Sequence, residues 1–208
     1  MSLSRTLVID TATAACSVAL IEDGAVIAQS EDRVGRGHAE KLIPMIASLP
    51  EGGRARHILV DVGPGSFTGI RVGIAAARAL ALGWGASVAG YSSLSLLAAA
   101  ALAEDGKAPL AAVLEGGHGE VFMQLFAAPL APLGAMESLT PAAARDRIGA
   151  ARAFGDGLRW LRSDDPRAES PGDLPRAADA VLLPPALTQL PPSPLYGRAP
   201  DAKPQGPR

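Results

Sequence analysis

The amino-acid sequence predicts the α/β fold class, with a mixed sheet flanked by helices. Three observations predict it. Residues 1–30 contain short apolar runs separated by a turn, residues 38–103 alternate helical and strand-like patterns, and a polar break at residues 104–107 precedes a second, strand-rich half. A hairpin meander that leads into alternating helices and strands excludes both a closed barrel and an all-parallel sheet.

Composition excludes several classes of protein. The chain has 208 residues, of which 48% are hydrophobic and 19% charged, so a generally disordered chain is excluded. A formal charge of −2 gives no sign of a basic nucleic-acid surface or of a polybasic membrane binder. One cysteine and three histidines exclude a disulfide framework and argue against a structural zinc site. Since no leader peptide or membrane-spanning run is evident, we expect a cytoplasmic protein without a membrane partner.

The first strands follow from short apolar runs at residues 6–9, 17–21 and 25–28. Asp23 and Gly24 separate the second run from the third, and Asp-Gly between apolar runs is a strong hairpin signal. The chain is therefore expected to open with a three-stranded antiparallel meander. Cys16 lies in the second run and is interpreted as a small core residue.

The middle of the chain has alternating signals. Apolar residues at helical spacing predict helices at residues 38–49 and 70–82, and an Ala/Leu-rich helix over residues 92–103 with Ser92 as its N-cap. Apolar runs predict strands at residues 57–62 and 87–89.

Beyond the polar break, residues 110–114 and 121–126 are expected to form a hairpin, and Pro141 opens a helix to about residue 148. Residues 151–154 are a candidate strand, and residues 179–183 are the last segment with an ordered pattern. We therefore divide the chain into an N-terminal lobe (1–105), a smaller C-terminal lobe (106–190) and a Pro-rich tail (191–208).

The sharpest local motif is the Gly-rich run GPGSFTG at residues 63–69, between a strand and a helix. Gly63, Gly65 and Ser66 at a helix N-terminus could cradle an anion. The run is neither a Walker loop nor a nucleophile elbow, and no acidic residue follows at the distance a dinucleotide fingerprint requires. A tight strand-to-helix turn is an equally good interpretation. Asp10, Thr11 and Thr13 follow the first strand, where they could face a phosphate or cap a turn.

Small side chains form a stripe along the next helix, with two interpretations: packing on the helix's own sheet, or contact with a partner subunit. The stripe consists of Gly69, Gly73, Ala76, Ala77 and Leu80, and Arg71 and Arg78 mark the solvent side. Two acids and a histidine at residues 115–120 are interpreted as a solvated hairpin turn rather than a metal site.

These segments together resemble one family. They are IDTAT (9–13), CSVA (16–19), His38 with LIPMI (42–46), GPGSFTGIRVG (63–73), YSSL (91–94), GEVF (119–122), FGDG (154–157) and PLY (194–196). The chain resembles the TsaB (YeaZ) family of the actin-like superfamily, with the connection at residues 50–56 shorter than is usual there. The resemblance implies an actin-like, ribonuclease H-like fold of two tandem related lobes, the second reduced.

The resemblance also implies a function. Members of the family are non-catalytic subunits that dimerise with the transferase TsaD, which threonylcarbamoylates the adenosine beside the tRNA anticodon. TsaE joins the larger complex, and tRNA is reached indirectly. TsaD holds a metal with a His pair, and Ser93 and Leu97 stand at the corresponding positions here. No catalytic or metal-binding residue is therefore expected, and no tightly bound cofactor beyond weak ATP or ADP binding in the complex.

The expected partner-binding residues are on two helices, and a homodimer of the isolated protein would use the same surface. They are His38, Leu42, Met45, Ile46, Gly69, Arg71, Gly73, Ala76, Ala77 and Leu80. The expected vestigial phosphate-binding residues are Asp10, Thr11, Thr13, Gly63, Gly65 and Ser66. Two alternatives stay open: a nucleotide-dependent kinase or transferase of the same fold, and, more weakly, a glycoprotease-like peptidase.

Overall fold

The first sheet is built by the N-terminal part of the chain. The structure, a computed structural model, describes residues 5–161 and 174–195. The strands follow the order β3-β2-β1-β4-β5, where β1, β2 and β3 are antiparallel neighbours and β4 and β5 run parallel to β1. The predicted meander is confirmed. The strands are β1 (Arg5–Asp10), β2 (Ala15–Glu22), β3 (Ala25–Arg33), β4 (His57–Asp61) and β5 (Ser87–Tyr91).

Helices alternate with these strands as the sequence predicts. They are α1 (His38–Ala47), the 3₁₀ turn η1 (Pro50–Gly53), α2 (Phe67–Trp84) and α3 (Ser93–Asp105). α2 begins three residues before the predicted start because the Ser66 hydroxyl accepts a hydrogen bond from the Gly69 N–H and caps the helix. Ser92 is the N-cap residue of α3, as predicted, but its hydroxyl accepts no capping hydrogen bond. No helix in the described ranges has the length and apolar character needed to cross a membrane.

The second sheet has the strand order β10-β6-β7-β8, with β9 also paired to β7. The predicted hairpin, strand and helix of this half are confirmed, and Thr140 caps α4. β8, β9 and α5 were not predicted, since elements of two to four residues carry no readable periodicity. The elements are β6 (Leu110–Gly117), β7 (Glu120–Ala127), β8 (Ala131–Pro132), β9 (Glu137–Leu139), α4 (Pro141–Ile148), β10 (Arg152–Phe154) and α5 (Leu158–Leu161).

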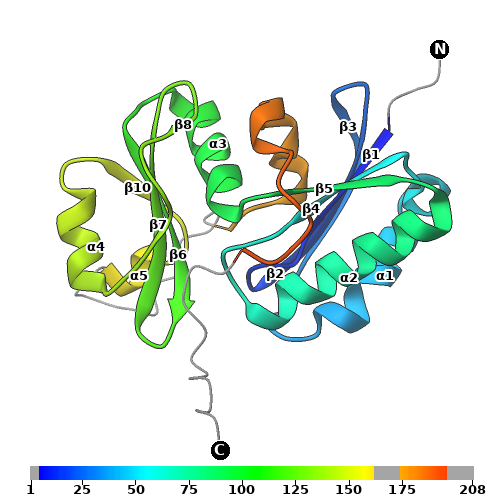
Figure 1. The fold of residues 1–208 in the computed structure, drawn as a ribbon, viewed down its shortest axis with the longest axis horizontal. Coiled ribbons are helices and arrows are strands. Elements are labelled where there is room, and N and C mark those ends of the chain that lie inside the picture. Colours follow the sequence, from blue (N-terminus) through cyan, green and yellow to red (C-terminus); the bar gives the residue numbers. More distant parts are fainter. Residues whose placement is uncertain (1–4, 162–173, 196–208) are drawn as a thin grey trace, which may run out of the picture.

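The two sheets stand side by side in a layered molecule (Figure 1). Strand residues alternate between layers: Leu7 and Ile9 of β1 pack under α1 and α2, while Val8 faces α3. In the same way Leu110 faces α3, and Ala111 faces α4 and α5. The molecule therefore has successive layers: the outer helices, the first sheet, α3, the second sheet and the opposite helices. The predicted α/β class, with mixed sheets flanked by helices, is confirmed.

The chain returns to the first lobe after α5. Residues 174–195 include the 3₁₀ turns η2 (Ala177–Leu182) and η3 (Pro185–Leu187), and η2 lies against β2 and α3. Leu190 then pairs with Gly90 at the free edge of β5, and the Leu195 N–H donates to the Val62 carbonyl at 2.7 Å. The predicted boundaries at residues 105 and 190 did not anticipate this return, and the remainder of the predicted tail, residues 196–208, lies outside the described residues.

Candidate functional site

Three polar side chains meet at one edge of the first sheet. Asp10, Asp61 and Tyr91 are the last residues of β1, β4 and β5, which are mutually parallel, so their carboxyl ends lie together. All three side chains are fully buried. Such an edge is the usual place for a ligand site in an α/β sheet, which makes this cluster the candidate functional site.

Each carboxyl group has its own set of donors. Asp10 accepts from the Ala12 N–H at 3.3 Å and from the Tyr91 hydroxyl at 3.1 Å. Asp61 accepts through Oδ1 from the Gly63 N–H at 2.6 Å and from the Ser93 hydroxyl at 2.8 Å. The second oxygen of Asp61, Oδ2, is buried and has no hydrogen-bond partner among the described residues, which leaves an unsatisfied acceptor beside an ionisable neighbour.

That neighbour is Asp10. Burial, the charge of Asp61 and a hydrogen bond to Asp61 raise the pKa of Asp10 well above its ordinary value. Burial raises the pKa of Asp61 to about 6, against the lowering effect of its donors. Burial disfavours ionisation of both carboxyl groups, and therefore favours the state in which the pair keeps one proton between them. Burial also raises the pKa of Tyr91, which keeps the phenol a donor.

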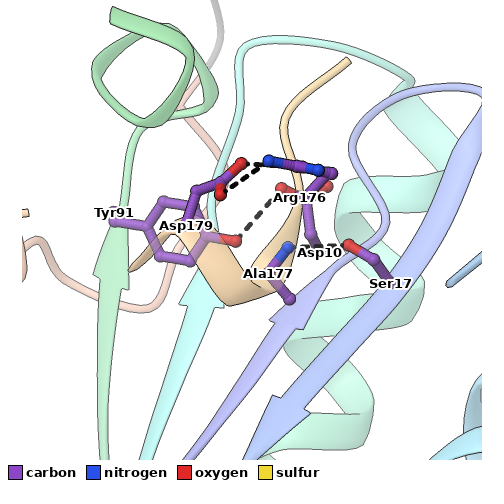
Figure 2. Close-up of polar contacts among 6 residues, drawn as sticks. All are labelled: Asp10, Ser17, Tyr91, Arg176, Ala177 and Asp179. Carbon is purple, nitrogen blue, oxygen red and sulfur yellow. Dashed lines mark hydrogen bonds and ion pairs between the residues drawn. The ribbon is translucent and has the colours of Figure 1, made fainter. Parts of the chain in front are cut away.

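The C-terminal segment covers this cluster. Figure 2 shows Ala177 of η2 donating its N–H to the Ser17 hydroxyl of β2, at 2.9 Å, beside Asp10 and Tyr91. Arg176 and Asp179 form a two-bonded ion pair at 2.9 and 3.0 Å next to the Tyr91 ring. The cluster is therefore enclosed by the chain's own backbone rather than open to solvent.

The structure brings the predicted phosphate-binding residues together, but they bind one another. The Ser66 N–H donates to the Ala12 carbonyl at 2.6 Å, and the Thr11 hydroxyl donates to the Gly69 carbonyl at 2.8 Å. A Cβ on Gly65 would lie 2.0 Å from the Ala12 carbonyl oxygen, so the Gly-rich loop lies directly against the turn between β1 and β2.

The Gly-rich loop thus forms the tight strand-to-helix turn that was the alternative interpretation, with the Ser66 N–H bound inside the fold, and phosphate binding there stays a prediction. Of the remaining predicted phosphate ligands, the Thr13 hydroxyl accepts from the Ala15 N–H, and Gly63 donates its N–H to Asp61. These donors and acceptors are used inside the fold.

Most predicted partner-binding residues are core residues. The stripe of Gly69, Gly73 and Ala77 is buried on the sheet side of α2, where a Cβ on Gly73 would lie 2.4 Å from the Thr11 hydroxyl oxygen. That stripe packs on its own sheet, so assigning it to a partner contact was wrong. The same correction applies to the buried side chains of α1, which are His38, Leu42, Met45 and Ile46.

His38 has a structural role. Its Nε2 lies 2.9 Å from the Thr13 carbonyl and 3.2 Å from the Ala15 carbonyl, which ties α1 to the turn after β1. Arg71 is exposed as predicted, and Ala76 and Leu80 are partly exposed. Of the predicted partner-binding residues, Arg71, Ala76 and Leu80 therefore reach the outward side of α2, and the others are buried.

The turn at residues 115–120 is a hairpin, as interpreted. His118 stands at its tip with φ 52°, and Glu120 accepts from the Ser138 hydroxyl while Glu115 pairs with Arg159. In the described part of the chain no group of three His, Cys, Asp or Glu side chains is placed to hold a metal ion.

Three residues of the cluster were missed by the sequence analysis: Asp61, Tyr91 and Ser93. One signal could have found Asp61, because it ends a buried strand next to the strand that Asp10 ends. The carboxyl ends of adjacent parallel strands lie at the same edge of a sheet. The sequence of neither strand, however, indicates that β1 pairs in parallel with β4.

Comparison with known proteins gives consistent matches. The sequence is 40% identical over 126 residues to the tRNA threonylcarbamoyladenosine biosynthesis protein TsaB of Escherichia coli, an alignment covering 57% of this chain and 53% of that protein. The solved structure of YeaZ from Pseudomonas aeruginosa superposes with a TM-score of 0.73 at 29% identity, covering 86% of this chain and 89% of that one. The chain is similar in sequence and in fold to proteins of the TsaB (YeaZ) family.

Two further matches add to this similarity. A family model described as TsaD, tRNA N6-adenosine threonylcarbamoyltransferase, matches residues 30–129. An uncharacterized protein of Mycobacterium tuberculosis is 29% identical over 98% of this chain and 96% of its own length. The chain spans about half the length of the curated TsaB proteins it matches, 53% for that of E. coli.

Proposed function

We propose that this protein acts in the cytoplasm in the biosynthesis of threonylcarbamoyladenosine in tRNA, as a non-catalytic subunit that binds and activates a TsaD-type transferase. Its TsaB relatives are named for that pathway, and the TsaD family model matches residues 30–129. In this proposal TsaE joins the larger complex, tRNA is contacted through it, and the isolated protein can form a homodimer with the same surface.

The observation that carries the non-catalytic part is the closed state of the Gly-rich loop. A nucleotide-dependent kinase or transferase needs free donors for phosphate and an ionised carboxylate for a metal ion. Here the Ser66 N–H is bound to Ala12, and Asp10 is buried with a pKa raised well above its ordinary value, which disfavours its ionised form. The kinase-like alternative is therefore disfavoured.

The positions aligned with the transferase's His pair support the same conclusion. Ser93 is fully buried and donates to Asp61, and Leu97 is packed in the core between the sheets. A hydroxyl and an aliphatic side chain cannot replace imidazole ligands for a transition metal. Among the histidines, His38 is bound to backbone carbonyls and His57 to the Ser87 hydroxyl, which disfavours the peptidase alternative.

The partner would contact the exposed side of α1 and α2. Both helices cover the outer face of the first sheet (Figure 1), and each leaves large apolar side chains in solvent. Ile43 is 49% exposed, Phe67 65% and Leu82 87%. We call these three residues, with Ala75 and Ala79 between them on α2, the α1–α2 surface. Exposed apolar side chains on adjacent helices are typical of a protein interface.

The test is reconstitution with the TsaD-type protein of the same organism. We expect the two proteins to co-purify, the isolated chain to form no threonylcarbamoyladenosine in tRNA with or without ATP, and the transferase to be markedly more active with this chain than without it. Transfer by the isolated chain would contradict the non-catalytic role, and failure of the two proteins to associate would contradict the partner.

Nucleotide binding by the isolated protein distinguishes a non-catalytic subunit from a kinase-like enzyme. With the loop closed, we propose that ATP and Mg²⁺ bind there no more tightly than about 1 mM. Micromolar ATP affinity that is lost on changing Asp10 or Ser66 would restore the kinase-like alternative.

A further inference from the structure

A second polar site lies at the other end of α2. An open hollow of about 610 Å³ is formed where β1, β4 and the C-terminus of α2 meet, between Arg5, Arg54, Arg56 and Trp84. α2 has 18 residues, so at ~1.5 Å per residue the hollow is ~27 Å from the Gly-rich loop. Its volume is in the range of about 300–1,000 Å³ that ligand pockets occupy. Neither the candidate functional site nor the α1–α2 surface uses these residues.

Two arginines in this hollow have no acidic partner among the described residues, and its three arginines and two glutamates leave a net charge of +1. Arg5 is bound to Glu22 at 2.6 Å and to Glu51 at 3.1 Å, so both acids of the hollow are engaged with one guanidinium. Arg54 and Arg56 are exposed, and within residues 5–161 and 174–195 neither guanidinium has an ion pair or hydrogen bond.

The backbone holds the segment that carries both arginines. Ala55, between them, is buried at 6% exposure, while Arg54 and Arg56 on either side of it are both exposed. The Arg56 N–H donates to the Arg5 carbonyl, and the Arg56 carbonyl accepts from the Ser87 N–H. The segment is thereby held between β1 and β5, and the two guanidinium groups are presented from a rigid edge.

Trp84 supplies an aromatic surface beside these charges. It is the last residue of α2, packs one part of its indole on the core under α1 and α2, and stays partly exposed. An indole face accepts a stacked base, and guanidinium groups bind phosphate through paired hydrogen bonds. A phosphomonoester carries a charge of about −1.5 to −2 at neutral pH, which matches two unpaired arginines.

We propose that this hollow binds a nucleotide unit, with its phosphate against Arg54 and Arg56 and its base on Trp84. The chemistry is common to a free mononucleotide and to an unstacked nucleotide of an RNA, and the test distinguishes the two. The site does not depend on the proposed function, because it uses none of the residues of the α1–α2 surface.

Tryptophan fluorescence tests the site directly. The chain has two tryptophans, so the Trp160→Phe variant leaves Trp84 as the reporter. We expect AMP to change its fluorescence saturably, and adenosine or inorganic phosphate alone to bind at least about tenfold more weakly, since each offers half of the contacts. If a short single-stranded RNA binds more tightly than AMP and displaces it, the source is an RNA; if AMP binds and the RNA does not, the source is a free nucleotide.

Matched variants decide whether the arginines are responsible. Arg54→Gln with Arg56→Gln should weaken AMP binding about tenfold or more, measured both by fluorescence and by equilibrium dialysis. Arg33→Gln with Arg36→Gln, which removes the same charge from the opposite edge of the sheet, should leave it within about twofold. Thermal unfolding of the double variant, and the single Arg54→Gln variant, check that the loss of AMP binding is not caused by misfolding. No saturable signal with AMP or RNA, or equal weakening by both double variants, would overturn the proposal.

Discussion

Asp10 and Asp61 bury their carboxyl groups together at the carboxyl ends of β1 and β4. Tyr91 donates to Asp10 and Ser93 donates to Asp61, while the second oxygen of Asp61 has no hydrogen-bond partner among the described residues. A neutral acid beside one carboxylate carries half the charge of two carboxylates, and burial favours that state. The end of β1 where the sequence predicts phosphate-binding residues therefore holds a buried pair of interacting carboxyl groups.

The first prediction concerns pH. Both pKa values are raised in the folded state, so the folded protein binds more protons than the unfolded chain above about pH 4. The free energy of unfolding therefore falls as the pH rises through about 6, by about 3 kcal/mol for Asp61, and falls further as Asp10 ionises. Chemical denaturation across this pH range measures it.

Asp61→Asn is the informative variant for this slope. The amide keeps an oxygen for the Gly63 N–H and Ser93 and supplies an N–H in place of the shared proton. We expect a flatter pH profile and equal or higher stability at alkaline pH, whereas Asp61→Ala should lose about 2–3 kcal/mol. The exposed Asp32→Asn, which removes a carboxylate bound to Lys41, should leave the slope unchanged. A slope that persists in Asp61→Asn would refute the shared proton.

The second prediction concerns Gly73. A Cβ at this position would lie 2.4 Å from the Thr11 hydroxyl oxygen, so Gly73→Ala should cost about 1–3 kcal/mol through overpacking. Gly83, in the same helix, has nothing within 4 Å of its would-be Cβ, and Gly83→Ala should stabilise the protein by about 1 kcal/mol. Urea unfolding of both variants provides the comparison; similar effects from the two would show that Gly73 is not packed on the sheet.

The third prediction concerns the cap of α2. The Ser66 hydroxyl accepts from the Gly69 N–H at 3.2 Å, so Ser66→Ala should destabilise the protein by about 1 kcal/mol. Ser66→Asp should retain most of that stability, because a carboxylate also caps a helix N-terminus. Thermal unfolding distinguishes the two variants. If Ser66→Ala leaves the stability of the protein unchanged, the hydroxyl does not stabilise the helix and is free for another role.

The fourth prediction concerns the α1–α2 surface. Ile43→Glu and Leu82→Glu should each weaken binding of the TsaD-type partner at least about tenfold, since a buried carboxylate at an interface lacks a partner. Ile27→Glu on β3 is the matched control, because Ile27 is 43% exposed and Ile43 49%. Titration calorimetry gives the affinities, and circular dichroism confirms folding. Equal loss of affinity in all three variants would place the contact elsewhere or show it to be non-specific.

The first lobe could be predicted from the sequence because its signals are local. The Asp23-Gly24 turn fixes the β2–β3 hairpin, and the strands alternate cleanly between two buried faces. The helix after the Gly-rich loop was correctly placed, although it begins three residues earlier and ends two residues later than predicted. Its start was missed because the Ser66 cap was interpreted as part of a ligand loop.

The site was harder to predict because it is assembled by contacts distant in sequence. The role of Asp10 depends on Asp61, on Tyr91 and on the return of residues 174–195, none of which a local pattern indicates. The small residues of α2 show the same difficulty: Gly73 has the spacing of a helix–helix contact, and only the position of Thr11 shows that the sheet already fills that space.

The middle layer has a consequence for motion. Leu94 and Phe126 pack in the same continuous core as Val8 and Ala180, so the first sheet, α3, η2 and the second sheet share one interior. Enzymes that close two domains around a substrate need a cleft that opens without exposing a core. Separating these lobes would instead expose large apolar side chains, at about 1.5–3 kcal/mol each. The two halves therefore move as one rigid body, and a partner meets a surface whose shape is set before it binds.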